Sequence, residues 1–244
     1  FVWWPEQICR LFDSLMQGYP FGTFLFWRIA PEKRQEYQFY DFVRDYHERD
    51  NYHCALLKAL PERDLVAVLD GQQRMTALNI GLRGSYAWKL PGKWWSSNDA
   101  FPIRHLYLDL LGEPDAETGS EYRFEFLTET ATELTGEGQL WLRVSRVLGE
   151  SEDDLIDSLD ELDLSAEQRR QAKKVLRHLY RTVHHKELIS YYEETEQDLG
   201  RVLNIFIRMN SGGTTLTRIY CCPLPWRSGR SLMRGRRFIS SSTR

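Results

Sequence analysis

An abrupt change of character at Asp70 and Gly71 marks the best-defined unit of this 244-residue sequence. Residues 65–69 are apolar and partly β-branched, which predicts a short buried strand. Residues 72–82 then carry apolar side chains at helical spacing. Aspartate followed by glycine is typical of a tight turn. The sequence therefore predicts a strand, a turn at Gly71 and a helix in direct succession.

The turn is polar, although it follows an apolar strand. It contains, in order, Asp70, Gly71, Gln72, Gln73, Arg74, Met75 and Thr76. The first amides of a helix lack intrahelical acceptors and lie at the positive end of the helix dipole, so an anion can bind there. Arg74 adds a planar fork suited to phosphate, and Asp70 is a carboxylate of the kind that holds Mg²⁺ beside phosphates. A structural explanation stays open, in which Asp70 caps the helix and Arg74 forms an ion pair.

A second polar turn follows the helix predicted over residues 198–209. It consists of Asn210, Ser211, Gly212 and Gly213. Asparagine followed by glycine is typical of a helix C-terminus, and this explanation suffices by itself. In the functional alternative, the glycine amides close over the ligand of the first turn together with Asn210. We predict on that basis that Arg74 and Asn210 line the same pocket.

The rest of the chain is expected to mix helices with short strands. Further helices are expected over residues 4–17, near 39–48, from 151 and over 165–183. Strands are expected over residues 23–27, 103–111, 121–127 and 187–192, and a loop over 84–98. A serine and a glutamine at positions 165 and 168 predict a capping box for the longest helix.

Several protein classes lose support. The sequence has no G-x-x-x-x-G-K-[ST], G-x-G-x-x-G or G-x-S-x-G pattern, which argues against P-loop NTPases, kinases, Rossmann dehydrogenases and α/β-hydrolases. No window approaches 18 consecutive apolar residues, so no membrane span or membrane partner is expected. The four cysteines form no C-x-x-C pair, which favours a reducing, cytoplasmic setting.

Charge is distributed unevenly along the chain. The net charge is −3, yet residues 218–244 carry seven arginines and no aspartate, glutamate or lysine, so the remainder carries −10 (−3 minus +7). Three explanations of this basic tail stay open: a sequence translated out of frame, an arm that binds nucleic acid, or a disordered end. We predict that residues 219–244 do not contribute to the main core, because their long side chains lack acidic partners and apolar periodicity.

The two motifs together resemble a known family. Residues 69–78 (LDGQQRMTAL) resemble the DGQQR signature of the GmrSD N-terminal domain, and residues 205–213 (IFIRMNSGG) are similar to its second motif. The tryptophan-rich segment over residues 3–27 is also similar, and the resemblance covers residues 1–217. It implies an α+β fold of the ParB and sulfiredoxin type, with a small mixed sheet and surrounding helices. It leaves residues 218–244 as a basic, atypical tail.

The resemblance also implies a function. Family members serve as the NTPase and regulatory half of DNA-modification-dependent restriction or anti-phage systems. By this resemblance Asp70 and Arg74 are the catalytic candidates, and Asp70 also orients Mg²⁺ with a nucleoside triphosphate. The nucleotide-binding candidates are Gly71, Gln72, Gln73, Thr76, Asn210, Ser211, Gly212 and Gly213. Expected partners are DNA, contacted indirectly or through another domain, an HNH-type nuclease domain or subunit, and a second copy of the chain.

The sequence departs from the family pattern in three places. An I-P-x-x-Q-R strand is absent before Trp3, so we expect the chain to begin inside a longer protein. No H-x-x-P nuclease motif occurs, so cleavage is not assigned to this chain, and NTP hydrolysis stays open. The chain also leaves the family pattern after Arg218. The alternative function is a non-enzymatic DNA-binding or scaffold module of the same fold, which would require a basic face within residues 1–217.

Overall fold

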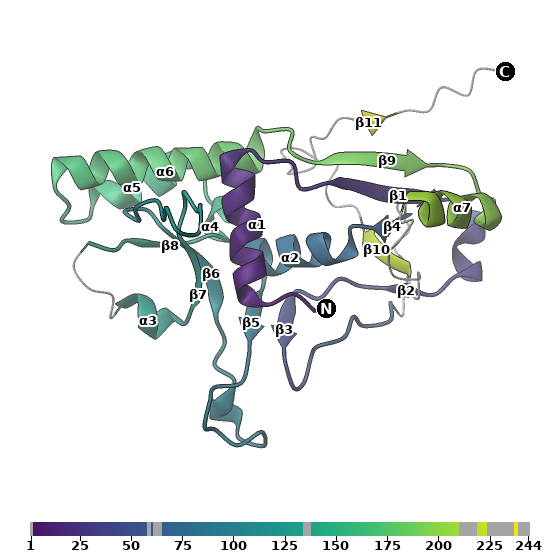
Figure 1. Ribbon diagram of the computed structural model, residues 1–244, viewed down its shortest axis with the longest axis horizontal. Coiled ribbons are helices and arrows are strands. Elements are labelled where there is room, and N and C mark those ends of the chain that lie inside the picture. Colours follow the sequence, from purple (N-terminus) through teal and green to yellow (C-terminus); the bar gives the residue numbers. More distant parts are fainter. Residues whose placement is uncertain are drawn as a thin grey trace.

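The computed structural model describes residues 2–57, 60, 65–133, 138–209, 219–223 and 237–238 (Figure 1). Its helices are α1 (Pro5–Gln17), α2 (Gln72–Arg83), α3 (Glu129–Glu133), α4 (Arg146–Gly149), α5 (Glu152–Asp160), α6 (Ala166–His184) and α7 (Leu199–Met209), with 3-10 turns at Pro31–Glu36 and Asn98–Ala100. Helices and small sheets are mixed along the chain, so the fold is α+β, as predicted. Among the described residues, no helix combines the length and apolar character needed to cross a membrane.

Eleven short strands form three sheets within the described residues. They are β1 (Thr23–Ile29), β2 (Phe39–Tyr40), β3 (Asp45–His47), β4 (Leu65–Asp70), β5 (Ser85–Ala87), β6 (His105–Asp109), β7 (Phe124–Leu127), β8 (Trp141–Arg143), β9 (Ser190–Glu194), β10 (Ile219–Pro223) and β11 (Arg237–Phe238). The largest sheet has the order β11-β9-β1-β4-β10-β2 and is mixed, because β1 is antiparallel to β4 and parallel to β9. The predicted small mixed sheet with surrounding helices is therefore present.

The central strands are buried on both faces, because successive side chains of a strand point to opposite sides. Phe24 and Val68 belong to the large cluster that contains the apolar faces of α1 and α2. Leu25 and Ala67 belong to a second cluster with Phe206 of α7. The sheet is thus held between α7 and the α1–α2 pair.

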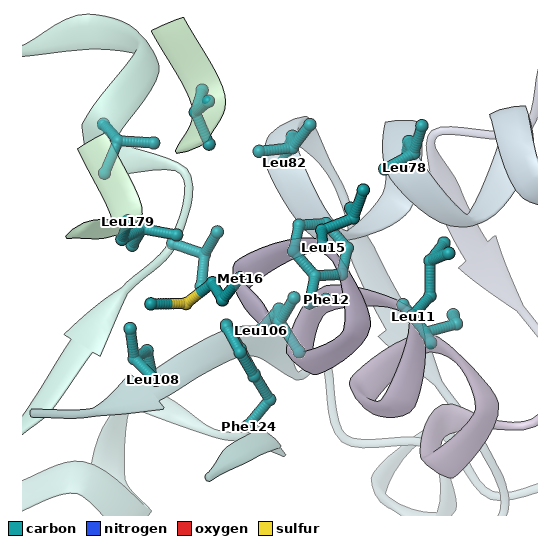
Figure 2. Close-up of a cluster of buried hydrophobic side chains, with 14 of the residues drawn as sticks. Leu11, Phe12, Leu15, Met16, Leu78, Leu82, Leu106, Leu108, Phe124 and Leu179 are labelled. Carbon is teal, nitrogen blue, oxygen red and sulfur yellow. The ribbon is translucent and has the colours of Figure 1, made fainter. Parts of the chain in front are cut away.

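Helix α1 organises the large core. Its residues Leu11, Phe12, Leu15 and Met16 meet α2, α6 and the β6–β7 hairpin in the cluster shown in Figure 2. Fully burying such side chains contributes about 1.5–3 kcal/mol each. A cavity of about 20 Å³ remains among them, large enough for about one water molecule. Gly81 of α2 is close enough to Phe12 that a Cβ would overlap the ring, so the glycine permits the close approach of the two helices.

Most predicted elements are confirmed, including the two strands that pair as the β6–β7 hairpin and the capping box at the start of α6. The helix predicted near residues 39–48 is wrong. This stretch contains β2 and β3 instead, because Phe39 is buried in the core of the largest sheet and Tyr46 packs on Tyr86 with ring centres 4.4 Å apart. The loop predicted over residues 84–98 likewise contains β5, which pairs in parallel with β3.

Two strands from the segment 219–244 pair with the largest sheet. Strand β10 pairs antiparallel with β4, with Tyr220 opposite Val68, and β11 pairs in parallel with β9. The physical reason is that β4 is an interior strand, and its backbone groups on both sides need hydrogen-bond partners. The sheet therefore includes strands beyond residue 217, whereas the expectation that residues 219–244 do not contribute to the main core stays a prediction.

Candidate nucleotide-binding turn

The turn after β4 has the predicted geometry. Strand β4 ends at Asp70, Gly71 follows with a φ of +89°, and α2 begins at Gln72. This φ lies in the left-handed region, which glycine adopts without steric cost. A Cβ at position 71 would in addition overlap the ring of Phe24. Glycine is therefore required at this position both for the backbone conformation and for the approach of β1.

The N-terminus of α2 has no side-chain cap. Gly71 is its N-cap residue, and within the described part of the chain no hydrogen bond reaches the amides of Gln73 or Arg74. The first helical bond runs from the Met75 N–H to the Gly71 carbonyl at 2.9 Å. Unpaired amides at the positive end of a helix dipole favour an anion. The turn thus has the elementary requirement of a phosphate site.

Arg74 connects the turn to the loop that precedes β1. Its Nη1 donates to the Phe21 carbonyl at 2.6 Å, and its Nη2 donates to the Thr23 carbonyl at 3.1 Å. The same Nη2 lies 3.3 Å from Asp70 Oδ2. These contacts occupy three of the five N–H groups of a guanidinium. The predicted Arg74–Asp70 ion pair is present, and Arg74 also holds the loop against the motif.

Sequence reasoning missed the part that Gly22 and Phe24 play at this turn. Gly22 has a φ of +92°, and a Cβ there would overlap Nη1 of Arg74. The Arg74 Cζ lies 4.7 Å from the centre of the Phe24 ring, within the range of a cation–π contact. The signal in the sequence is a glycine placed directly before an aromatic strand. That signal predicted a turn but gave no indication of its partner, which lies 52 positions further along the chain.

The two charges of the motif are partly shielded from solvent. The Arg74 side chain is 20% exposed and that of Asp70 is 31% exposed. Burial lowers the pKa of Arg74, and the neighbouring Asp70 carboxylate acts in the opposite direction. Because the ordinary pKa of arginine exceeds 12, Arg74 remains charged at neutral pH. Positive charge is thus fixed beside the uncapped amides.

The remaining side chains of the motif contact nearby backbone. Gln72 Nε2 donates to the Val68 carbonyl at 2.9 Å, and Gln73 Oε1 accepts from the Val2 N–H at 3.2 Å. The buried Thr76 hydroxyl donates to the Gln72 carbonyl at 2.8 Å, inside its own helix. Thr76 therefore supports the first turn of α2 from within, whereas Gln73 lies beside the segment that leads into α1.

A comparison with protein families shows to which family the chain is related. A family model described as the N-terminal domain of the GmrSD restriction endonuclease matches residues 1–219. The chain belongs to this family. The match includes both polar motifs and ends at the first residue of β10. No sequence among curated proteins matches the chain.

The second motif of this GmrSD N-terminal domain, Asn210 to Gly213, lies outside the described residues. The predicted proximity of Arg74 and Asn210 therefore stays a prediction. The flanking elements are described: α7 ends at Met209, and β10 begins at Ile219. Because Tyr220 pairs with Val68, β10 begins at the same end of the sheet at which β4 reaches the DGQQR turn.

Within the described part of the GmrSD domain, no three histidine, cysteine, aspartate or glutamate side chains gather as a metal site. Asp70 is the only carboxylate of the DGQQR turn. Its Oδ2 is paired with Arg74, whereas its Oδ1 accepts no hydrogen bond from the described residues. This arrangement suits Mg²⁺ that arrives with phosphates, since such ions use one or two carboxylates and keep several waters. It does not suit a metal bound by protein alone.

Proposed function

We propose that this chain binds a nucleoside triphosphate at the DGQQR turn, as the NTPase or NTP-sensing domain of a prokaryotic defence system that responds to modified DNA. Membership in a restriction endonuclease family supports a defence-related role. The observation that carries the nucleotide site is the uncapped N-terminus of α2, placed directly after the buried β4 and beside the Arg74 charge.

Each motif residue has a proposed part in this site. The first amides of α2 receive phosphate oxygens, and Gly71 lets them approach. Asp70 orients Mg²⁺ that is shared with the phosphates, through its Oδ1. Arg74 neutralises phosphate charge through the two N–H groups that donate to none of the described residues. Slow hydrolysis suffices, because a sensor needs only different affinities for triphosphate and product.

Arg74 also gives this site a way to influence the rest of the fold. Its fork holds the Phe21 and Thr23 carbonyls, and this loop continues directly into β1, the strand beside β4. A phosphate that draws the guanidinium away would release one or both carbonyls. If the domain acts as a sensor, nucleotide binding at the turn therefore changes the conformation of the loop that leads into β1.

Calorimetric titration with ATP, GTP and CTP, each with and without Mg²⁺, tests the proposal. We expect one of the three nucleotides to bind, with higher affinity when Mg²⁺ is present. Mg²⁺ alone is expected not to bind at the turn, because only one carboxylate is available there. The alternative, a DNA-binding or scaffold module without a nucleotide, is favoured if none of the three nucleotides binds.

Substitution of Gln73 by glutamate locates the site. Glutamate keeps the oxygen that accepts from the Val2 N–H, and a negative charge in the first helical turn stabilises a helix. The same charge repels a phosphate on the amides of that turn. At about 5 Å and an effective dielectric constant of about 20, this repulsion is about 3 kcal/mol per unit charge. Gln73→Glu is therefore expected to weaken nucleotide binding at least about tenfold without loss of stability.

Gln168→Glu is the matched control. Gln168 lies in the first turn of α6, and its Oε1 accepts from the Ser165 N–H at 3.0 Å. The substitution makes the same chemical change at the start of another helix. We expect it to leave nucleotide affinity unchanged. Equal affinities of the two variants would place the nucleotide elsewhere and contradict the proposal.

A further inference from the structure

A groove of about 650 Å³ lies between α6 and the connection from β6 to β7. Four basic side chains of α6 line it, at positions spaced by four, three and four residues: Arg170, Lys174, Arg177 and Arg181. This spacing places them on one face of the helix. At 1.5 Å per residue they extend over about 16 Å. The groove therefore has one wall that is basic along its length.

A neighbouring side of the same helix is neutralised. Helix α5 packs against α6 there, and its Asp160 lies 2.6 Å from Lys173 Nζ and 3.6 Å from Arg169 Nε. Both of these cations thus share a carboxylate partner within the protein.

The groove side is not neutralised in this way. Within the described residues, the ion pairs of Arg170 and Arg177 are long: 3.9 Å to the exposed Glu167 and 3.8 Å to the half-buried Glu152. Such pairs contribute little, typically below about 1 kcal/mol. No ion pair within the described residues involves the exposed Lys174 or Arg181.

The far wall of the groove is held in place before any ligand binds. The Asp13 carboxylate accepts the N–H groups of Glu121 and Tyr122 at 3.1 and 2.9 Å. The Tyr122 ring stacks on His178 of α6, with ring centres 5.5 Å apart and planes 15° apart. Two carboxylates line the groove among the described residues: the exposed Glu121, and the buried Asp109, whose Oδ1 accepts the N–H groups of Leu111 and Leu140.

We propose that this groove binds the phosphate backbone of duplex DNA, with the basic stripe of α6 contacting consecutive phosphates. The cations are spread along a helix and do not converge on one point, which suits an extended polyanion better than a single small anion. Duplex DNA presents about nine charges over about 16 Å. The contacts are to phosphates, so they position the protein on DNA and read no sequence.

This proposal is independent of the nucleotide site. In Figure 1, α1 stands between the two regions: α5, α6 and the β6–β7 hairpin lie on one side, and the largest sheet with the start of α2 lies on the other. The groove supplies the basic face within residues 1–217 that a DNA contact requires. A nucleotide at the turn and DNA in the groove can therefore be tested separately.

The test compares two double variants of the full chain. Lys174→Gln with Arg181→Gln removes two charges from the groove side, whereas Arg169→Gln with Lys173→Gln removes two from the α5 side. Both variants change the net charge equally and keep a good helix former. The arginines of residues 218–244 are the same in both, so the difference between them reports on α6 alone. Affinity for a fluorescent DNA duplex is measured by anisotropy from about 50 to 200 mM salt.

We expect the groove-side variant to bind the duplex about 10- to 100-fold more weakly at about 0.1 M salt, with a log–log salt slope shallower by about two. The α5-side variant is expected to bind like the unmodified chain. Equal binding by both variants, or no measurable DNA binding at all, would overturn the proposal. So would binding of poly-glutamate, in place of DNA, that depends on Lys174 and Arg181, because the groove would then be a protein-docking surface. Circular dichroism confirms that both variants are folded.

Discussion

Replacing Arg74 by methionine tests whether this residue stabilises the fold before any ligand binds. Methionine keeps the length of the side chain and its contact with the Phe24 ring, but it removes the donors to the Phe21 and Thr23 carbonyls. A buried acceptor that loses its partner costs about 1–3 kcal/mol. The Arg74 side chain is 20% exposed, so water can replace part of this loss. We therefore expect Arg74→Met to lower the free energy of unfolding by about 2–4 kcal/mol.

The measurement is urea unfolding in the absence of nucleotide, followed by tryptophan fluorescence. Arg170→Met is the control, because the Arg170 side chain is 81% exposed and its one ion pair is long. Exposed substitutions of this kind change stability by about 0.5 kcal/mol or less. The slope of the unfolding free energy with urea should stay the same for both variants, since neither changes the surface exposed on unfolding.

Two results would refute this reasoning in different ways. If Arg74→Met unfolds at the same urea concentration as the unmodified chain, the contacts to the Phe21–Thr23 loop contribute no stability. If it also loses nucleotide binding, Arg74 acts only on the ligand. A loss of stability together with retained nucleotide affinity would show the reverse, that Arg74 positions the loop and the phosphates depend on the amides of α2.

Two further predictions concern glycine and cysteine. Gly71→Ala should lower the free energy of unfolding by about 2–4 kcal/mol, because the Cβ overlaps the Phe24 ring at a positive φ. Gly18 also has a positive φ but faces open space, so Gly18→Ala should lower it by only about 1 kcal/mol. Urea unfolding measures both values. Burial raises the pKa of the Cys9 thiol to about 12, so very little of the reactive Cys9 thiolate is present at pH 8. A thiol reagent should therefore modify Cys54 at least about 100-fold faster than Cys9, which peptide mapping measures. Similar destabilisation by the two alanines, or equal labelling of the two cysteines, would contradict these expectations.

The elements that could be predicted from the sequence are those with local signals. The DGQQR turn combines an apolar run, a glycine and a helical period within 20 residues, and the structure confirms its strand, turn and helix. The capping box at Ser165 and Gln168 also uses only neighbouring residues, and it is present at the start of α6. In both places the local preference and the tertiary structure agree.

The elements that could not be predicted depend on distant partners. Strand β3 exists because it pairs with β5, about 40 positions away, and no local pattern in either segment indicates this pairing. The Phe21 carbonyl that Arg74 holds lies 53 positions before it. Strand β10 lies in a segment whose composition indicates no strand, yet β4 provides a partner for its backbone. Composition describes side chains, whereas these contacts are made largely by the backbone.

The net charge of a chain is likewise a poor guide to whether one face of it binds DNA. An excess of −10 over residues 1–217 argues against a DNA-binding face, but salt screens charges beyond about 10 Å at 0.1 M ionic strength. Only the nearest charges therefore act on a phosphate in the α6 groove. Asp160 neutralises the α5 side of the helix, whereas Lys174 and Arg181 face the groove. Of the adjacent lysines 173 and 174, the first is thus paired with Asp160, whereas the second faces the groove. Only the three-dimensional arrangement shows which of them a DNA backbone can reach.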